Sequence, residues 1–123
     1  MFKDLFSLKG RVALVTGGSR GIGKMIAAGF LAQGAARVYI TARKAAACEA
    51  TAVELTAQYD GECIALPIDI SNLAGVEMLA KEISKREPKL DILVNNAGAA
   101  WGAEFDEFPE SGWDKVMNLN VKS

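Results

Sequence analysis

The chain alternates short apolar runs with longer segments of mixed polarity. Four runs are rich in Val, Leu and Ile, and each is followed by glycine or polar residues: 11–16, 37–41, 62–66 and 90–95. The first and last runs are nearly continuous in apolar residues, which is typical of strands covered on both faces. The middle two are mixed and predict strands nearer a sheet edge.

Between these runs, apolar residues recur every third or fourth position, which predicts amphipathic helices. The first helix is predicted to bury Ile22, Ile26 and Phe30 and to end near Gly34. Two further helices are predicted over 45–59 and 72–86, and a last one begins near Glu110 and runs to the final residue. The predicted stripes of the middle two are Cys48, Ala52, Leu55 and Tyr59, then Leu73, Val76, Leu79, Ala80 and Ile83, with Ser71 as N-cap of the second.

This alternation of strands and helices predicts an α/β fold with a parallel sheet built from right-handed crossovers. We expect residues 1–123 to form a single domain with helices on both faces of this sheet. Because the chain ends inside a predicted helix, we expect a domain truncated at its C-terminal end.

Composition narrows the possible functions. The net charge of −1 creates no field that would attract nucleic acid or a membrane, and we expect neither as a partner. No histidine is present, which excludes Ser-His-Asp triads and most zinc sites. Cys48 and Cys63 match no metal-ligand spacing and are interpreted as packing residues. No apolar stretch approaches the roughly 20 residues of a membrane span, and a cytoplasmic location is expected.

The most informative segment, 16–23, follows the first predicted strand and opens the first predicted helix. Gly17 permits a tight turn, Gly21 lets the backbone approach a pyrophosphate, and Gly23 allows close packing of the helix. A helix N-terminus also attracts phosphate. The alternative is a P-loop nucleotide triphosphatase, but Met25 stands where that motif needs a hydroxyl.

Four elements together resemble the short-chain dehydrogenase/reductase family. They are Thr16-Gly-x3-Gly-Ile-Gly23, Asp69 after the third strand, Asn95-Asn-Ala-Gly98 after the fourth, and Trp113-Asp-Lys-Val-Met-Asn-Leu-Asn120. Within the family the chain is similar to bacterial 3-oxoacyl reductases of the rhamnolipid-precursor branch. The resemblance implies that residues 1–123 are a dinucleotide-binding domain with a Rossmann-type doubly wound sheet of strand order 3-2-1-4. It also implies an NADP(H)-dependent oxidoreductase that acts on a small-molecule carbonyl substrate and whose full-length form is a homodimer or homotetramer.

The resemblance also implies roles for individual residues. Asp69 would accept from the adenine amino group beside the Ile70 backbone, and Asn120 would hold a water of the proton relay. The asparagines at 95 and 96 would also tie neighbouring strands together. The residues that would line the cofactor are Gly17, Ser19, Arg20, Gly21, Ile22 and Gly23 at the pyrophosphate and adenosine ribose, and Asn96, Ala97 and Gly98 at the nicotinamide ribose.

The charges near the end of the second predicted strand bear on the choice between NAD and NADP(H). NAD-preferring members place an acid at the end of the second strand, where it holds the ribose 2′-hydroxyl. Ala42 occupies that position here, Arg43 follows it, and Arg20 lies in the glycine-rich turn. Two guanidinium groups without a carboxylate favour a 2′-phosphate, and therefore NADP(H).

The family's catalytic Ser and Tyr-x-x-x-Lys have no counterpart in the chain, whose tyrosines are Tyr39 and Tyr59. We therefore expect this chain alone to be inactive, and its fourth strand to be an exposed, aggregation-prone edge. Two alternatives remain open, namely a non-catalytic NADP(H) sensor and a structural domain that binds nothing. A Tyr-x-x-x-Lys encoded downstream of Ser123 would favour the reductase.

Overall fold

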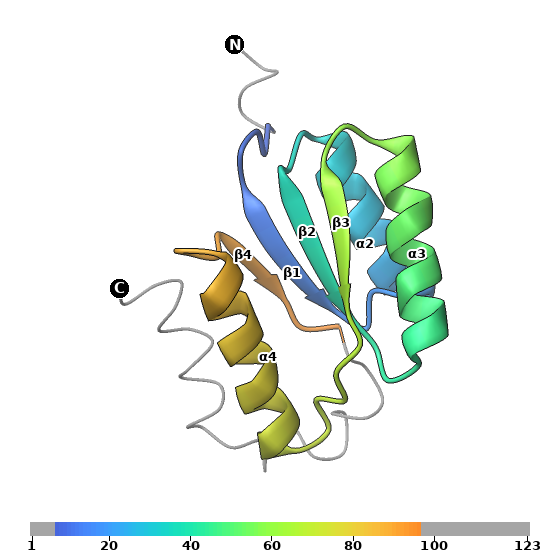
Figure 1. The fold of residues 1–123 in the computed structure, drawn as a ribbon. Coiled ribbons are helices and arrows are strands. Elements are labelled where there is room, and N and C mark those ends of the chain that lie inside the picture. Colours follow the sequence, from blue (N-terminus) through green and yellow to red (C-terminus); the bar gives the residue numbers. More distant parts are fainter. Residues whose placement is uncertain (1–6, 97–123) are drawn as a thin grey trace.

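The strands form one parallel sheet. The computed structural model describes residues 7–96, in which β1 pairs with both β2 and β4, and β2 also pairs with β3. The order is therefore β3-β2-β1-β4, as the resemblance implied (Figure 1). The elements are β1 (Val12–Thr16), α2 (Gly21–Ala32), β2 (Arg37–Thr41), α3 (Ala45–Gln58), β3 (Glu62–Leu66), α4 (Leu73–Arg86) and β4 (Ile92–Val94).

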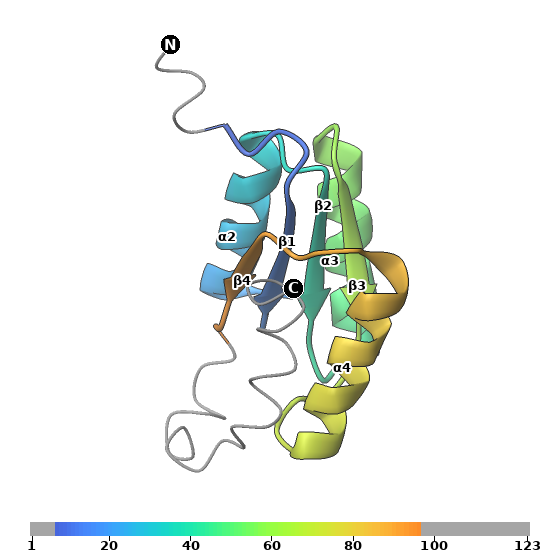
Figure 2. The ribbon, with the colours of Figure 1, turned by 90° about the vertical axis from the view of Figure 1, so that its left-hand side faces the viewer.

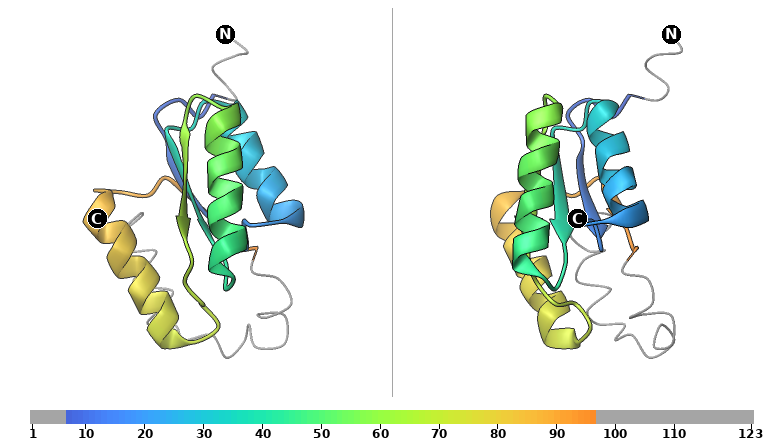
Figure 3. Two further views of the ribbon diagram at one scale, coloured as in Figure 1. Left: turned by 45° about the vertical axis from the view of Figure 1, so that its right-hand side comes forward. Right: turned by 90° about the vertical axis from the view of Figure 1, so that its right-hand side faces the viewer.

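Helices cover both faces of this sheet, so that two apolar cores form. Alternate residues of β1 enter opposite cores: Ala13 and Val15 pack with α2 and α3, whereas Val12 and Leu14 pack with α4. Figure 2, which looks onto the sheet, and the left view of Figure 3, which looks along it, show α2 and α3 on one side and α4 on the other. This is the doubly wound arrangement that the alternation of strands and helices predicted.

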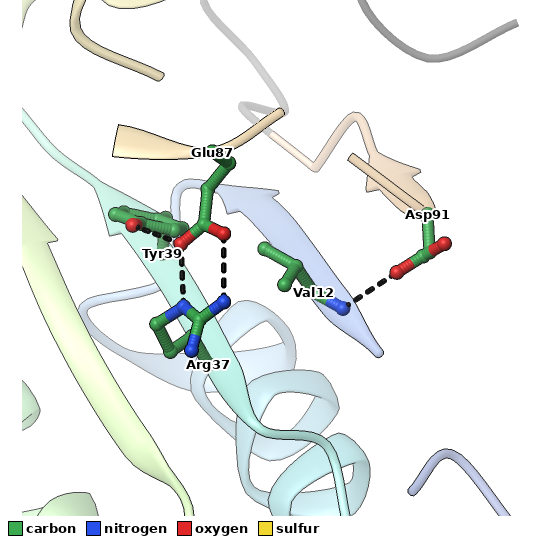
Figure 4. Close-up of polar contacts among 5 residues, drawn as sticks. All are labelled: Val12, Arg37, Tyr39, Glu87 and Asp91. Atoms are coloured by element: carbon green, nitrogen blue, oxygen red, sulfur yellow. Dashed lines mark hydrogen bonds and ion pairs between the residues drawn. The ribbon is translucent and has the colours of Figure 1, made fainter. Parts of the chain in front are cut away.

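The prediction for the inner and outer strands was partly wrong. β2 lies between β1 and β3 with all its residues buried except half-buried Arg37, whereas β4 has only three residues, all half-buried. The polar residues that made β2 look like an edge strand have specific partners. Arg37 and Tyr39 both bind Glu87, which satisfies them inside the sheet (Figure 4).

Two local helix predictions were wrong in part. The fully buried residues of α2 are Gly23, Ala27 and Leu31, one position after the predicted set. Ile26 and Phe30 are half-buried and pack against the core, whereas Ile22 is 68% exposed. The reason is that α2 approaches the glycine-rich turn by its backbone, because a Cβ at Gly23 would collide with the Gly17 carbonyl.

At the start of α4, Asn72 is the N-cap in place of Ser71. The Asn72 side chain accepts the Gly75 N–H at 2.8 Å, while the Ser71 N–H is used by Asp69. Asn72 occupies the cap because helical backbone begins one residue later than predicted, at Leu73. The predicted last helix lies outside the described residues.

At the amino edge of the sheet, charged and polar side chains are bound by other groups of the chain (Figure 4). The Glu87 side chain is 2% exposed and accepts from Arg37 Nη2 at 2.7 Å and from the Tyr39 hydroxyl at 2.6 Å. The Arg37 hydrogen bonds hold the pKa of Glu87 below its ordinary value. Burial, reinforced by Glu87, raises the pKa of Tyr39 to about 12. Asp91 also accepts the Val12 N–H at 2.9 Å, so each carboxylate is partnered within the chain.

Candidate functional site

A groove lies at the opposite, carboxyl edge of the sheet, where the strand arrowheads in Figure 1 point. Its volume is about 860 Å³, and its walls come from the turn after β1, the start of α3, the segment after β3, and Asn96 after β4. In open parallel sheets, ligands bind outside the carboxyl ends of the strands at the point where strand order reverses. Here that point lies between β1 and β4, so the groove occupies the expected position.

The glycine-rich turn adopts a shape that depends on its glycines. Gly17 has φ 67° and Gly21 has φ 59°, which is the left-handed region that side chains with a Cβ disfavour. The space beside Gly21 is open to 4 Å, whereas a Cβ at Gly23 would meet the Asn96 side chain. The Gly18 N–H donates to the Thr41 carbonyl at 3.2 Å and ties the turn to the end of β2. The roles expected of Gly17 in the turn and Gly23 in close packing are thus confirmed.

A side chain from α3 gives the turn a second attachment. The Thr51 hydroxyl donates to the Ser19 carbonyl at 2.7 Å, and Thr51 is only 5% exposed. The sequence contained one sign of this contact, because Thr51 is a polar residue one helical turn after Cys48 on a buried apolar stripe. The sequence alone could not identify its partner.

Three cations gather at the groove. Arg20, Arg43 and Lys44 all line it, and none of them forms an ion pair within residues 7–96. Lys44 was missed by the sequence reasoning, although it directly follows Arg43 at the end of β2. The N-terminus of α3 adds to the positive potential here, since its first turn contains no acidic residue.

Asp69 is the one carboxylate among the described residues that line the groove. Its Oδ1 accepts the Ser71 N–H at 2.9 Å. This hydrogen bond, together with the Ser71 side chain and the nearby Arg43 charge, holds the pKa of Asp69 below its ordinary value. Asp69 is therefore an ionised acceptor whose position is set by the local turn.

Thr16 joins the ends of β1 and β4. Its hydroxyl oxygen lies 3.3 Å from both the Val94 carbonyl and Asn95 Oδ1, and it accepts the Asn96 N–H at 2.7 Å. The interpretation that the paired asparagines tie neighbouring strands together is confirmed. The same contacts hold the Asn96 backbone at the groove.

The structure brings most of the predicted site residues together. Ile22 and Gly23 belong to the first turn of α2 but do not line the groove, while Ala97, Gly98 and Asn120 lie outside the described residues. The predicted residues that line it are Gly17, Ser19, Arg20, Gly21, Arg43, Asp69, Ile70 and Asn96. The lining residues that the sequence did not assign to the site are Thr41, Ala42, Lys44, Ala47, Ile68 and Ser71.

Other chemistries find little support in the described part of the chain. No cluster of His, Cys, Asp or Glu within residues 7–96 could hold a metal ion. Cys48 and Cys63 are free thiols in the apolar core, and burial raises the pKa of Cys63 to about 12, so that it is a poor nucleophile. Tyr39 is bound to Glu87 at the far edge of the sheet. No helix in the same range is both long and apolar enough to cross a membrane.

Comparison with known sequences identifies relatives across nearly the whole chain. Residues 11–123 match the family model described as short chain dehydrogenase. The rhamnolipids biosynthesis 3-oxoacyl-[acyl-carrier-protein] reductase of Pseudomonas aeruginosa is 58% identical over 118 residues, which is 96% of this chain and 45% of that protein. An NAD-dependent glycerol dehydrogenase of Listeria innocua is 36% identical, covering 98% of this chain and 46% of the relative. The chain thus spans about half the length of these relatives.

Solved structures agree with this placement. A Pseudomonas aeruginosa RhlG/NADP active-site complex matches with a TM-score of 0.76 and 45% identity, over 94% of this chain and 47% of that one. L-sorbose reductase from Gluconobacter frateurii, in complex with NADPH and L-sorbose, matches with a TM-score of 0.78 and 26% identity, over 95% and 48% of the two chains. Both proteins are similar to this chain across nearly all of its length.

Proposed function

This chain belongs to the short-chain dehydrogenase family, and we propose that it forms the NADP(H)-binding part of a carbonyl reductase. The observation that carries the proposal is the groove at the carboxyl edge of the sheet, which Arg20, Arg43 and Lys44 line without forming an ion pair within residues 7–96. Bound NADPH would supply a hydride to a substrate carbonyl carbon.

The pyrophosphate would bind at the glycine-rich turn. The first N–H groups of α2 have no partners within the helix, and the helix dipole places partial positive charge beside them. The open space at Gly21 lets a phosphate approach the backbone, and α2 has no acidic residue in its first turn to compete for these donors. This is the usual physical basis of a phosphate site.

The 2′-phosphate would bind between the turn and the start of α3. Arg20, Arg43 and Lys44 are exposed cations of the groove wall, and half-buried Ala42 leaves no carboxylate at the end of β2. Family membership alone does not decide between NAD and NADP, because the Listeria innocua relative is NAD-dependent. The charges of this chain favour the phosphorylated cofactor, since several cations and no acid at the end of β2 suit a dianionic phosphate.

The remaining contacts follow the resemblance. Asp69 and the Ile70 backbone would receive the adenine, and Asn96 would border the nicotinamide ribose. Asp69 follows β3 and Asn96 follows β4, and these two strands lie at opposite ends of the strand order. The proposed roles of Ile22 and Gly23 are indirect, through the start of α2. Ala97, Gly98 and Asn120 keep their predicted roles at the nicotinamide and the proton relay.

The proposed substrate is a 3-oxoacyl or similar small-molecule carbonyl compound, because a relative with 58% identity is a 3-oxoacyl-[acyl-carrier-protein] reductase. The proposal extends to a cytoplasmic protein whose full-length form is a homodimer or homotetramer. Reduction of the carbonyl also requires a proton donor, and the chain has no Tyr-x-x-x-Lys to provide one. We therefore expect cofactor binding without turnover from these 123 residues alone.

Thermal unfolding with NADPH, NADP and NAD tests the binding proposal. A ligand at 100 times its dissociation constant adds about 2.7 kcal/mol to the free energy of unfolding. We expect the melting temperature to rise with the phosphorylated cofactors and to change little with NAD at the same concentration. A folded chain that responds to none of them contradicts the proposal.

A chimera tests the reductase activity. Residues 1–123 would be joined to the remaining, C-terminal part of the Pseudomonas aeruginosa relative, and NADPH oxidation would be followed with a 3-oxoacyl substrate. Turnover by the chimera and none by the 123-residue chain is the expected result. A chimera that binds NADPH but reduces no carbonyl compound would favour the alternative of a non-catalytic NADP(H) sensor.

A further inference from the structure

We propose that Thr51 is a positioning residue for phosphate binding, which fixes the peptide between Ser19 and Arg20. The proposal rests on the proposed function, because the turn that Thr51 holds is the one expected to bind the cofactor phosphates. Thr51 itself is not among the residues that line the groove and acts only through the turn.

The contact is short and buried. The Thr51 hydroxyl donates to the Ser19 carbonyl at 2.7 Å across 32 residues of sequence, and Thr51 is 5% exposed. Its neighbours on the buried face of α3 are Cys48, Ala52 and Leu55, which pack into the apolar core. A hydroxyl at such a position is costly unless it is hydrogen-bonded, so the Ser19 carbonyl accounts for its presence.

The turn needs this attachment because its own geometry is permissive. Gly17 and Gly21, both with positive φ, flank the segment and allow backbone rotation that other residues would resist. Arg20 is the N-cap of α2, and its side chain makes no capping hydrogen bond. On the β2 side, the Gly18 N–H holds the turn through the Thr41 carbonyl. Thr51 holds it on the α3 side.

The consequence for the site comes from peptide geometry. In a planar trans peptide the carbonyl and the N–H point in opposite directions, and the described chain contains no cis peptide. Holding the Ser19 carbonyl toward α3 therefore directs the Arg20 N–H away from α3. It also fixes the point from which the Arg20 side chain extends. A rotation of this peptide would displace the donor and the cation together.

The test compares Thr51→Val, which keeps the side-chain shape and removes the hydroxyl, with Thr51→Ser, which keeps the hydroxyl. The matched control is Thr56→Val on the same helix. The Thr56 hydroxyl contacts the backbone of Cys63 at 3.0 Å and 3.1 Å, and Thr56 does not line the groove. Should Thr51→Val fail to fold, Thr51→Ala takes its place. The chimera described above serves as host if the 123-residue chain does not stay monomeric.

Two measurements are made on each variant. Hydrogen exchange of the amides of 17–21 in cofactor-free protein is expected to accelerate about tenfold in Thr51→Val and to return close to the wild-type rate in Thr51→Ser. The dissociation constant for NADPH is expected to rise three- to tenfold in Thr51→Val, in line with one lost hydrogen bond. Thr56→Val should leave both quantities within about twofold of wild type.

The outcomes separate the two proposals. If the wild-type protein binds no NADP(H), the proposed function and the role of Thr51 at a phosphate site both fail. If the wild type binds but Thr51→Val binds equally well, only the Thr51 proposal fails. Equal effects of Thr51→Val and Thr56→Val on affinity and on exchange of 17–21 would also overturn it, because they would indicate a general loss of stability.

Discussion

Both edges of the sheet carry charged side chains, but these differ in whether groups of the same chain bind them. At the amino edge, Glu87 and Asp91 are bound by groups of the same chain, and Glu87 is almost completely buried. At the carboxyl edge, Arg20, Arg43 and Lys44 are left without ion pairs among the described residues. Charges that are neutralised internally contribute to folding, whereas charges left open are available to a ligand. Because these three cations also line one groove, the difference supports the proposal that the carboxyl edge binds the cofactor.

The largest expected effect is the loss of stability when the buried Glu87 carboxylate at the amino edge is removed. Glu87→Ala removes the acceptor of Arg37 and Tyr39 and should lower the free energy of unfolding by about 3 kcal/mol, the lower end for a broken buried pair because Arg37 is partly solvated. Chemical denaturation measures this change. The matched control is Glu82→Ala, which removes a glutamate of α4 with two surface cation partners and should cost at most about 0.5 kcal/mol. NADPH affinity should be unaffected in both variants.

Removing the arginines that line the groove should weaken NADPH binding without changing the stability of the fold. The double variant Arg20→Ala with Arg43→Ala is expected to weaken NADPH binding about 100-fold, through two lost charge-assisted contacts. NAD binding should change much less, because NAD lacks the 2′-phosphate. Lys81→Ala is the control, since Lys81 is an exposed cation of α4 that does not line the groove. Equal losses for NADPH and NAD would contradict the assignment of these arginines to the 2′-phosphate.

A carboxylate introduced into the groove should pair with its cations, as Glu87 pairs with Arg37 at the amino edge. Ala42→Asp puts an acid beside Arg43 at the end of β2, where it would pair with the open cations and repel a phosphate. We expect about tenfold weaker NADPH binding and a gain for NADH, measured by titration. Ala42→Asn adds similar bulk without charge, so a comparable loss in that variant would show that volume and not charge is responsible.

The smallest expected effect is a loss of stability in acid. The hydrogen bonds from Arg37 hold the pKa of Glu87 below its ordinary value, so its contribution is complete above the unfolded value of about 4.3 and declines as pH falls through the folded pKa. Between pH 6 and pH 3.5 the free energy of unfolding should fall by about 1 kcal/mol more in wild type than in Glu87→Gln. Parallel pH profiles for the two proteins would exclude Glu87 as the source.

Local patterns in the sequence predicted the fold well where side chains decide the packing. The bounds of β2 and β3 agree with the predicted 37–41 and 62–66, and the stripe of α4 was right apart from half-buried Leu73. The predicted stripe of α2 was right for Ile26 and Phe30, which pack half-buried against the core, but wrong for Ile22. At that end the helix packs through its backbone, which leaves no apolar signal at Gly23. A pattern of apolar positions cannot show where a helix approaches a turn without a side chain between them.

The sequence predicted several residues of the candidate site that come soon after a strand. Gly17, Arg43, Asp69 and Asn96 all come after strand ends, and parallel strands bring such positions to one edge. Thr51 and Glu87 were not assigned a role because their partners are distant in sequence and leave no local pattern. Their contacts span 32 residues to Ser19 and 50 residues to Arg37. Such pairs become visible only when helices and strands have been placed in space.

The pairing of β4 with β1 has a consequence for how the groove is assembled. The Thr16 hydroxyl meets the Asn96 N–H across 80 residues, the longest such separation at the groove. The turn after β1, the start of α3 and the segment after β3 belong to successive strand-helix-strand units and need only neighbouring segments to assemble. The part of the groove proposed for the adenosine therefore depends on segments that are near one another in sequence. The part proposed for the nicotinamide also requires the pairing of β4 with β1.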